Sequence, residues 1–269
     1  MSKITSEKNI KIHVPTTGNK ILEKTVEAVN KNEEIFALWK VMNTNAMDRL
    51  GMSDHGVVHF QIVSNIALRL ARILTKKGVK MSSVVDLDLT NDHAEVIIFL
   101  ASIMHDLGMS INRSGHEEFS LILANNLMHQ ILDFLPIKER TYVISESLHA
   151  IISHRENGKP NTIEAGIVRV ADALDMSEGR SRIAYEAGNM DIYAISAAAI
   201  NSVEITEGED TPIKITITLN NSAGIFQIDE LLKSKIKDSK IEKYLEVIAQ
   251  VIEGKEKKLL KDYKIKPRG

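Results

Sequence analysis

The chain has 269 residues, of which 43% are hydrophobic and 26% are charged, and its formal net charge is −2. This composition is typical of a globular protein with one large domain, or one domain and a smaller appendage. The near-neutral charge gives no reason to expect a nucleic acid or an anionic membrane surface as a partner. Cysteine is absent, which excludes disulfides, thiolate metal ligands and cysteine nucleophiles.

The beginning of the chain and its hydropathy favour a cytoplasmic protein. The first residues lack the apolar core of a signal peptide. No run of about 18 uncharged apolar residues is present, so we expect no membrane span.

Helices are predicted for the first two thirds of the chain. Residues 1–19 are polar and interrupted by Pro15 and Gly18, which is typical of an arm. Apolar residues then recur at helical spacing, with capping residues and breakers between the runs. Ser114 and Glu117 are spaced as a capping box, and Thr162 is placed to cap the last of these helices. The predicted helices cover residues 20–50, 55–77, 95–107, 116–135, 138–154 and 163–174.

The pattern changes after about residue 199. Residues 203–205 and 213–219 alternate with period two and are rich in β-branched side chains, so they are predicted strands, and 224–227 is a candidate third strand. Two Lys-rich amphipathic helices are expected at 229–236 and 241–260. An apolar stripe on them predicts a packing or dimer face, and hence a homodimer. The stripe consists of Ile236, Ile241, Leu245, Ile248 and Ile252.

The predicted fold is therefore mainly α, with a small C-terminal α+β domain. We expect an N-terminal arm and helix over residues 1–30, an all-α body over 31–194 and the α+β domain over 195–269.

One apolar helix leads directly into His105 and Asp106 and stops at Leu107-Gly108. Burying an imidazole beside a carboxylate is costly unless both are paired, and a divalent metal pairs with both. Asp106 offers two oxygens and so could bridge two ions. Imidazole and carboxylate ligands also occur at other helix ends, and such a mixture suits one or two ions of Mn, Fe, Co, Ni, Zn or Mg. The candidate metal ligands are His59, His105, Asp106, His116, His154 and Asp172.

The order of these residues resembles the HD-domain superfamily of metal-dependent phosphohydrolases. The resemblance rests on His59 in segment 54–59, on His105-Asp106 in segment 103–108 and on Asp172 in segment 168–175. It covers roughly residues 30–190. It implies a helical HD domain in which His59, His105, Asp106 and Asp172 bind the first metal, with Asp106 bridging.

The resemblance also concerns the second metal. His116 and His154 fall where two-metal members such as the HD-GYP group place their second set of ligands. Arg155 and Lys159 stand where that group has a second His and a Tyr, and the spacing is shorter. A cyclic dinucleotide substrate is therefore not implied. Segment 172–176 looks more like that of prokaryotic HD hydrolases of unassigned substrate.

Catalytic roles are expected for His55, Asp106 and Arg182. His55 lies one helical turn before His59. It occupies the place of the proton donor in cyclic-nucleotide phosphodiesterases; the alternative is a capping or outer histidine. Arg180 and Arg182 could bind substrate phosphate, or form a surface pair.

The remaining candidates have mainly structural interpretations. Arg155 and Lys159 either line the pocket entrance or are solvated. His149 is expected to be structural or to lie outside the metal ligands, and His93 and His129 to be structural. His129 would replace His116 if that ligand is wrong, and His149 would replace His154.

The expected function is cleavage of a phosphomonoester or phosphodiester, by resemblance that of a nucleotide, by a metal-bound hydroxide. No phosphate-binding loop of the GxxxxGK[ST] type and no G-x-S-x-G motif is present. Two alternatives are an HD-type diiron oxygenase and a nucleotide-sensing regulatory protein without turnover.

Overall fold

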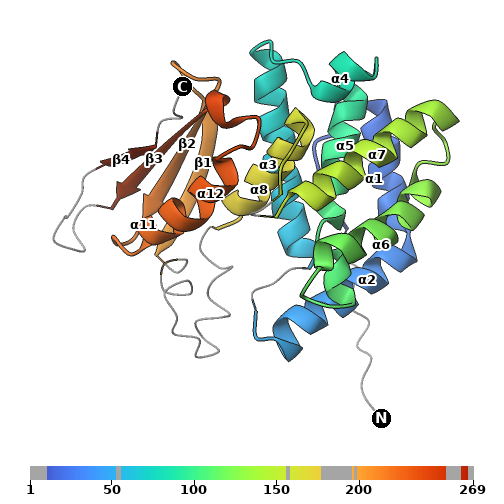
Figure 1. The fold of residues 1–269 in the computed structure, drawn as a ribbon, viewed down its shortest axis with the longest axis horizontal. Coiled ribbons are helices and arrows are strands. Elements are labelled where there is room, and N and C mark those ends of the chain that lie inside the picture. Colours follow the sequence, from blue (N-terminus) through green and yellow to red (C-terminus); the bar gives the residue numbers. More distant parts are fainter. Residues whose placement is uncertain are drawn as a thin grey trace.

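The computed structural model describes residues 11–52, 56–155, 158–176, 196, 199–252 and 262–265. A helical body is followed by a small sheet with short helices, and the sheet lies at one end of the molecule (Figure 1). The chain as a whole is therefore not all-α, but the prediction of a mainly helical protein with an α+β part is confirmed.

Eight α-helices of the described residues form the body. They are α1 (Lys20–Lys31), α2 (Glu33–Asn43), α3 (Val57–Lys76), α4 (Ser82–Asp86), α5 (Asn91–Met104), α6 (His116–Ile131), α7 (Ile137–Ser153) and α8 (Ile163–Leu174). A π-helical turn, Thr44–Arg49, follows α2, and a 3-10 turn, Leu107–Ser110, follows α5.

Helix α5 is the central element of the body. Every residue from Val96 to Met104 is buried. A helix that is apolar all round must be covered on all sides, and α5 packs against α1, α3, α7 and α8. Its C-terminal end, where His105 follows, therefore lies inside the molecule.

Helix α3 is long and apolar enough to span a membrane by length and composition, yet 56% of its most apolar window is buried. It packs against α5 and α8. These contacts are those of a core helix.

The N-caps of the helices agree only in part with the predicted ones. Thr162 accepts the predicted N-cap hydrogen bond of α8. Asn19 and Asn32, for which no cap was predicted, accept the corresponding bonds of α1 and α2. The predicted capping box of Ser114 and Glu117 is wrong, because Gly115 is the N-cap of α6, with φ 72°, and no side chain caps that helix.

The segment 79–89, expected to be a loop, contains the short helix α4. The buried Glu164 of α8 accepts hydrogen bonds from the N–H groups of Ser82 and Ser83, at 3.1 and 2.9 Å. A carboxylate that satisfies the free N–H groups of a helix start stabilises it. Such a long-range cap cannot be deduced from local spacing.

The C-terminal sheet contains β1 (Ile200–Glu207), β2 (Ile213–Leu219), β3 (Leu245–Val251) and β4 (Asp262–Ile265), in the order β1-β2-β3-β4. The outer pairs are antiparallel, and β2 pairs with β3 in parallel. The two strands predicted at 203–205 and 213–219 are confirmed as β1 and β2.

Two C-terminal predictions are wrong. Residues 224–227 are helical: α11 (Gly224–Phe226) continues through a π-helical turn, Gln227–Leu232, into α12 (Lys233–Ile236). The helix expected at 241–260 contains strand β3 instead. The apolar residues of this segment fit the period of a strand, at Leu245, Val247 and Ala249, as well as they fit the predicted helical stripe. Strand β2 supplies the parallel partner with which β3 pairs. The helical dimer face is therefore absent from residues 241–251.

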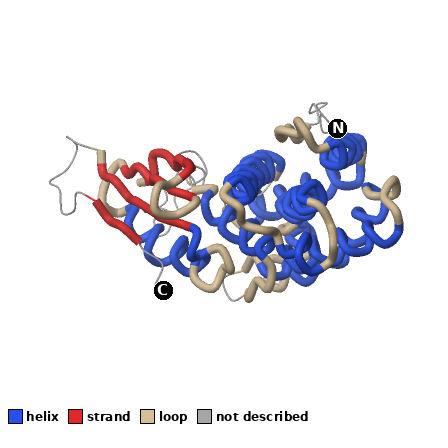
Figure 2. Tube along the Cα trace, turned by 90° about the horizontal axis from the view of Figure 1, so that it is seen from above, coloured by secondary structure: helices blue, strands red, loops and turns tan. Residues whose placement is uncertain are grey.

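The sheet and the body contact each other through two helices. Helix α8 packs against α12 and the π-helical turn before it, and α3 contacts β1 and β2. Figure 2 shows the strands gathered on one side of these helices. The predicted boundary near residue 195 falls outside the described residues; α8 ends at Leu174 and β1 begins at Ile200.

Candidate metal centre

The six predicted metal ligands lie together, although they come from five different helices. His59 is in the first turn of α3, His105 and Asp106 follow α5, His116 begins α6, His154 follows α7 and Asp172 is in the last turn of α8. Asp172 is partly exposed and the other five are buried. Helix ends from all sides of the body therefore converge on one point.

The turn after α5 is held by specific contacts. The Trp39 indole N–H donates to the Ile103 carbonyl at 3.0 Å. Ser120 Oγ lies 2.7 Å from the His105 carbonyl oxygen and accepts the Gly108 N–H at 2.8 Å. A Cβ on Gly108 would lie 1.9 Å from the His116 carbonyl oxygen. Only glycine lets α6 approach the His-Asp pair this closely.

Four potential ligand atoms form a first cluster. His59 Nε2 lies 3.2 Å from His105 Nε2. Asp172 Oδ1 lies 3.6 Å from each of these nitrogens. Asp106 Oδ2 lies 3.9 and 3.5 Å from them. Ligand atoms around one tetrahedral ion with bonds near 2.1 Å are about 3.4 Å apart, so these separations suit a single divalent ion.

The other oxygen of Asp106 belongs to a second cluster. Asp106 Oδ1 lies 3.0 Å from His116 Nε2 and 3.7 Å from His154 Nε2. Each carboxylate oxygen thus faces a different pair of histidines. This is the arrangement in which one carboxylate can bridge two ions.

Each of the four histidines has its Nδ1 beside an oxygen acceptor. His105, His116 and His154 each face the carbonyl of the third residue before them, at 3.0, 3.0 and 2.6 Å. His59 Nδ1 lies 2.6 Å from Asp175 Oδ2. A neutral imidazole that donates from Nδ1 has its lone pair on Nε2, and all four Nε2 atoms face the carboxylates. The donor set therefore fits divalent metal ions.

Burial and neighbouring charges shift the pKa values of three of these residues, His154, Asp172 and His105. Burial, with nearby His105 and Lys235, lowers the pKa of His154 to about 3, so this imidazole is neutral at physiological pH. Burial opposes the charged form of Asp172, but Lys235 and the two histidines outweigh it and hold the pKa of Asp172 well below its usual value. Burial likewise opposes protonation of His105, yet Asp106 and Asp172 raise its pKa overall.

Three further residues reach the cluster, and sequence reasoning gave them no role there. Asp175 orients His59; its position three residues after Asp172 was a usable signal. The buried carboxylate of Glu117 lies 3.3 Å from His116 Nδ1 and 3.3 Å from Arg155 Nε, whereas its spacing from Ser114 predicts only a cap. Lys235 of α12 lies 3.3 Å from Asp172 Oδ2. No local pattern indicates that a lysine 63 residues away in sequence reaches this carboxylate.

Other candidate histidines lie outside the cluster. His93 contacts Thr90 and Glu139 at the start of α5, His149 accepts the Asn161 N–H at 2.9 Å, and His129 is exposed. His129 and His149 therefore do not replace His116 and His154. The predicted catalytic residues His55 and Arg182, together with Arg180, lie outside the described residues.

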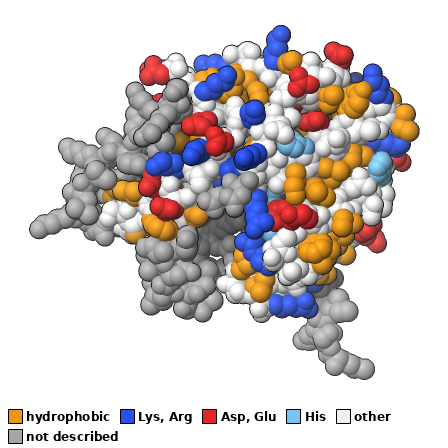
Figure 3. All heavy atoms as spheres, viewed as in Figure 1, with side chains coloured by type: hydrophobic (Ala, Val, Ile, Leu, Met, Phe, Trp, Pro, Cys, Tyr) orange, Lys and Arg blue, Asp and Glu red, His pale blue; other side chains and the backbone are white. Residues whose placement is uncertain are grey.

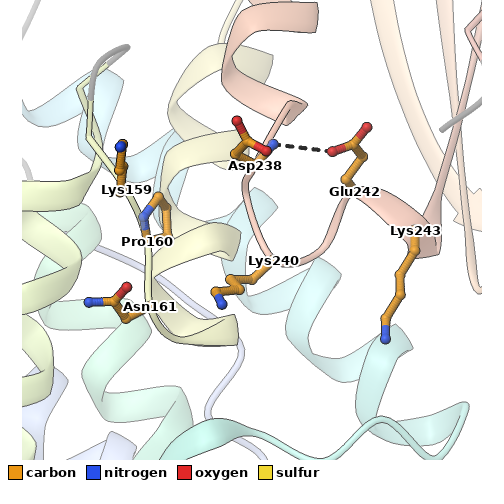
Figure 4. A pocket seen from close by; sticks show the side chains of 7 residues that line it. All are labelled: Lys159, Pro160, Asn161, Asp238, Lys240, Glu242 and Lys243. Carbon is orange, nitrogen blue, oxygen red and sulfur yellow. Dashed lines mark hydrogen bonds between the residues drawn. The ribbon is translucent and has the colours of Figure 1, made fainter. Parts of the chain in front are cut away.

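A cavity of about 520 Å³ opens beside the second cluster. Glu117, Arg155 and Lys159 are among its lining residues, with Glu118, His149, Ile152, Ser153 and Gly158. Arg155 and Lys159 are both exposed, which fits either interpretation given for them, lining an entrance or being solvated. A second cavity of similar volume, also lined by Lys159, lies between residues 159–161 and 238–243 (Figure 4). None of the six candidate ligands lines either cavity.

Comparison with known proteins agrees with this site. The HD domain family model matches residues 56–177, which include all six candidate ligands. The chain belongs to the HD-domain family, a superfamily of metal-dependent phosphohydrolases.

Over 222 residues, the chain is 43% identical to an uncharacterised protein, MJ1020, of Methanocaldococcus jannaschii. The match covers 82% of this chain and 86% of that protein. No solved structure is significantly similar to the chain.

Proposed function

We propose that this protein is a hydrolase that uses two divalent ions to cleave a phosphomonoester or phosphodiester of a nucleotide. The observation that carries the proposal is the position of Asp106, whose two oxygens face two separate pairs of Nε2 atoms. Divalent ions, when bound, lower the pKa of water to provide a nucleophile and neutralise charge on the phosphate.

The six candidate ligands form two sets, one for each proposed ion, and the two sets share Asp106. His59, His105 and Asp172 would hold one ion, His116 and His154 the other, and Asp106 both. Asp175 keeps His59 in the tautomer that presents Nε2, and the three carbonyl acceptors do the same for the remaining histidines. The proposed ions are Mn, Fe, Co, Ni, Zn or Mg; imidazole suits Zn, Fe and Ni, and carboxylate suits Mn and Mg.

Two catalytic roles remain proposals that rest on the resemblance. His55 would protonate the leaving oxygen, a role that suits imidazole near neutral pH. Arg182 would bind the phosphate through paired N–H groups.

The nucleotide substrate rests on the resemblance alone. The visible face of the described residues mixes basic and acidic side chains without a region of one sign (Figure 3), in keeping with a small-molecule substrate rather than a nucleic acid. We also propose a cytoplasmic location and no membrane partner. We also propose a homodimer, although residues 241–251 do not form the helical face predicted for it. Light scattering of the full chain tests this proposal.

The activity can be tested with bis-p-nitrophenyl phosphate and p-nitrophenyl phosphate, each with added Mn, Ni, Co or Mg. We expect metal-dependent turnover, and the preference between diester and monoester narrows the substrate class. Asp106→Ala should lose both bound metal and turnover, whereas Asp210→Asn, a change in an exposed turn, should keep both. Full metal content and full turnover in Asp106→Ala would contradict the proposal.

Two other results would contradict hydrolysis itself. Tight nucleotide binding without turnover for any metal would favour a sensor. Bound iron with oxygen consumption would favour an oxygenase.

A further inference from the structure

The face of α8 that meets the C-terminal part carries three residues at intervals of three. Gly166, Arg169 and Asp172 lie on one side of the helix, because residues three apart are neighbours on its surface. A Cβ on Gly166 would lie 1.8 Å from the Ser239 carbonyl oxygen, so the backbone after α12 touches α8 directly. This contact fixes how closely the C-terminal segment approaches the metal centre.

Arg169 fastens α12 to the body. Its buried guanidinium donates to the carbonyls of Ser234 and Lys235 at 3.0 and 2.9 Å, and to that of Arg155 at 2.8 Å. It also donates to the Gly158 carbonyl. One planar group thus joins the end of α12 to the segment after α7, which carries His154. The backbone of Lys235 is held in place by these bonds.

The side chain of Lys235 enters the metal centre from this position. Its ammonium donates to the His154 carbonyl at 2.6 Å and lies 3.3 Å from Asp172 Oδ2. The other oxygen of Asp172 faces His59 and His105. The ammonium therefore lies between a residue of the first cluster and a residue of the second.

An ammonium group has three N–H donors, and within the described residues the structure gives Lys235 these two partners. The side chain is 18% exposed, so the group is not sealed off from solvent. Its neighbouring carboxylate, that of Asp172, would itself hold a cation, so the ammonium leaves a donor and a positive charge for an anionic group.

We propose that Lys235 binds the substrate's phosphate, so that the C-terminal α+β domain is a working part of the active site. The inference rests on the proposed phosphohydrolase function for the identity of the anion. It goes beyond that function in assigning the contact to a residue of a different domain from the metal ligands.

The test uses the full-length protein loaded with Mn and three variants. Lys235→Met removes the charge at nearly constant length, and Lys235→Arg keeps the charge. Lys233→Met is the matched control, because Lys233 lies on the same helix and is 53% exposed. Metal content is measured by mass spectrometry, orthophosphate binding by calorimetry, and KM and kcat with p-nitrophenyl phosphate.

We expect Lys235→Met to bind orthophosphate about 10- to 100-fold more weakly at unchanged metal content, since a hydrogen bond to a charged group is lost. KM should rise by a similar factor. Lys235→Arg should restore part of the affinity, and Lys233→Met should match the wild type.

Unchanged phosphate affinity in Lys235→Met would overturn the proposal. Loss of metal in that variant would overturn it too, because Lys235 would then support the ligands rather than the substrate. If the wild type binds phosphate in a Lys235-dependent way but shows no turnover, the hydrolase function fails while the assignment of Lys235 stands.

Discussion

Each of the four histidines has an oxygen acceptor near Nδ1 that orients its ring. Three of the four acceptors are main-chain carbonyls three residues earlier, so they are built into the helix ends. The fourth acceptor is a side chain, Asp175, at 2.6 Å from His59. A substitution of Asp175 can therefore change the orientation of His59 without altering any candidate metal ligand.

Asp175→Asn should weaken metal binding about 10- to 100-fold, because an amide favours the Nδ1–H tautomer of His59 less than a carboxylate does. Calorimetric titration with Mn²⁺ measures this effect, and Asp210→Asn in the exposed turn is the control. Equal affinities of the Asp175 variant and the wild type would show that His59 needs no such partner.

The candidate ligands could be predicted because each is an unusual polar residue at the end of an apolar helix. His105 and Asp106 follow a helix that is buried along most of its length. Lys235 could not be predicted, because its place depends on the docking of α12 against α8. Glu117 was misinterpreted because its spacing from Ser114 fits a capping box, whereas Gly115 in a left-handed conformation begins α6.

At the scale of elements, helix α8 connects the two parts of the molecule. It carries Asp172 toward the metal centre and Gly166 toward the backbone of Ser239. The close approach at Gly166 has no room for a side chain.

Gly166→Ala should destabilise the protein by about 1–3 kcal/mol, since the added methyl group pushes the segment after α12 away from α8. The gain in helix propensity from glycine to alanine, at most about 1 kcal/mol, does not offset an overlap with backbone. Urea unfolding measures the change. A variant as stable as the wild type would mean that this segment does not pack tightly.

A second contact between elements is repulsive. Glu146 of α7 is partly buried near Glu164 of α8 and Asp86 of α4, and burial followed by these two carboxylates raises its pKa above 4.5. Folding therefore disfavours the charged form of Glu146. The free-energy cost of burying this charge is fully present at pH values above the raised pKa of Glu146 in the folded protein. It is absent at pH values below the ordinary pKa of a glutamate.

Glu146→Gln should consequently raise the melting temperature at pH 7, by about 1–2 °C for a chain of this size, and have no such effect at pH 4. Thermal unfolding followed by circular dichroism at both pH values measures this difference. Glu209→Gln, an exposed change of the same kind, should have no effect at either pH. A destabilised Glu146→Gln at pH 7 would show that the carboxylate has a favourable partner.

Secondary structure could be predicted well where one periodicity dominated. The body helices and the strands at 203–205 and 213–219 are of this kind. The prediction of secondary structure is wrong at 245–251, where the apolar residues fit both the helical and the strand period. The strand forms there because the segment pairs with β2, a contact between distant parts of the chain.

At the scale of the whole molecule, the metal centre is formed by contacts over most of the described chain. Its ligands range from residue 59 to residue 172, and Lys235 comes from beyond the body. Such a centre can form only when α3, α5, α6, α7 and α8 have packed, so a bound metal ion would stabilise the fold as a whole. Within this centre, we propose that Asp106 joins two metal positions.

The number of divalent ions bound per chain after dialysis against Mn²⁺ tests this bridge. Mass spectrometry measures it for the wild type and three variants. We predict near two ions for the wild type, near one for His59→Ala and for His116→Ala, and none for Asp106→Ala. Two ions retained in Asp106→Ala, or at most one in the wild type with no loss in His116→Ala, would contradict the account.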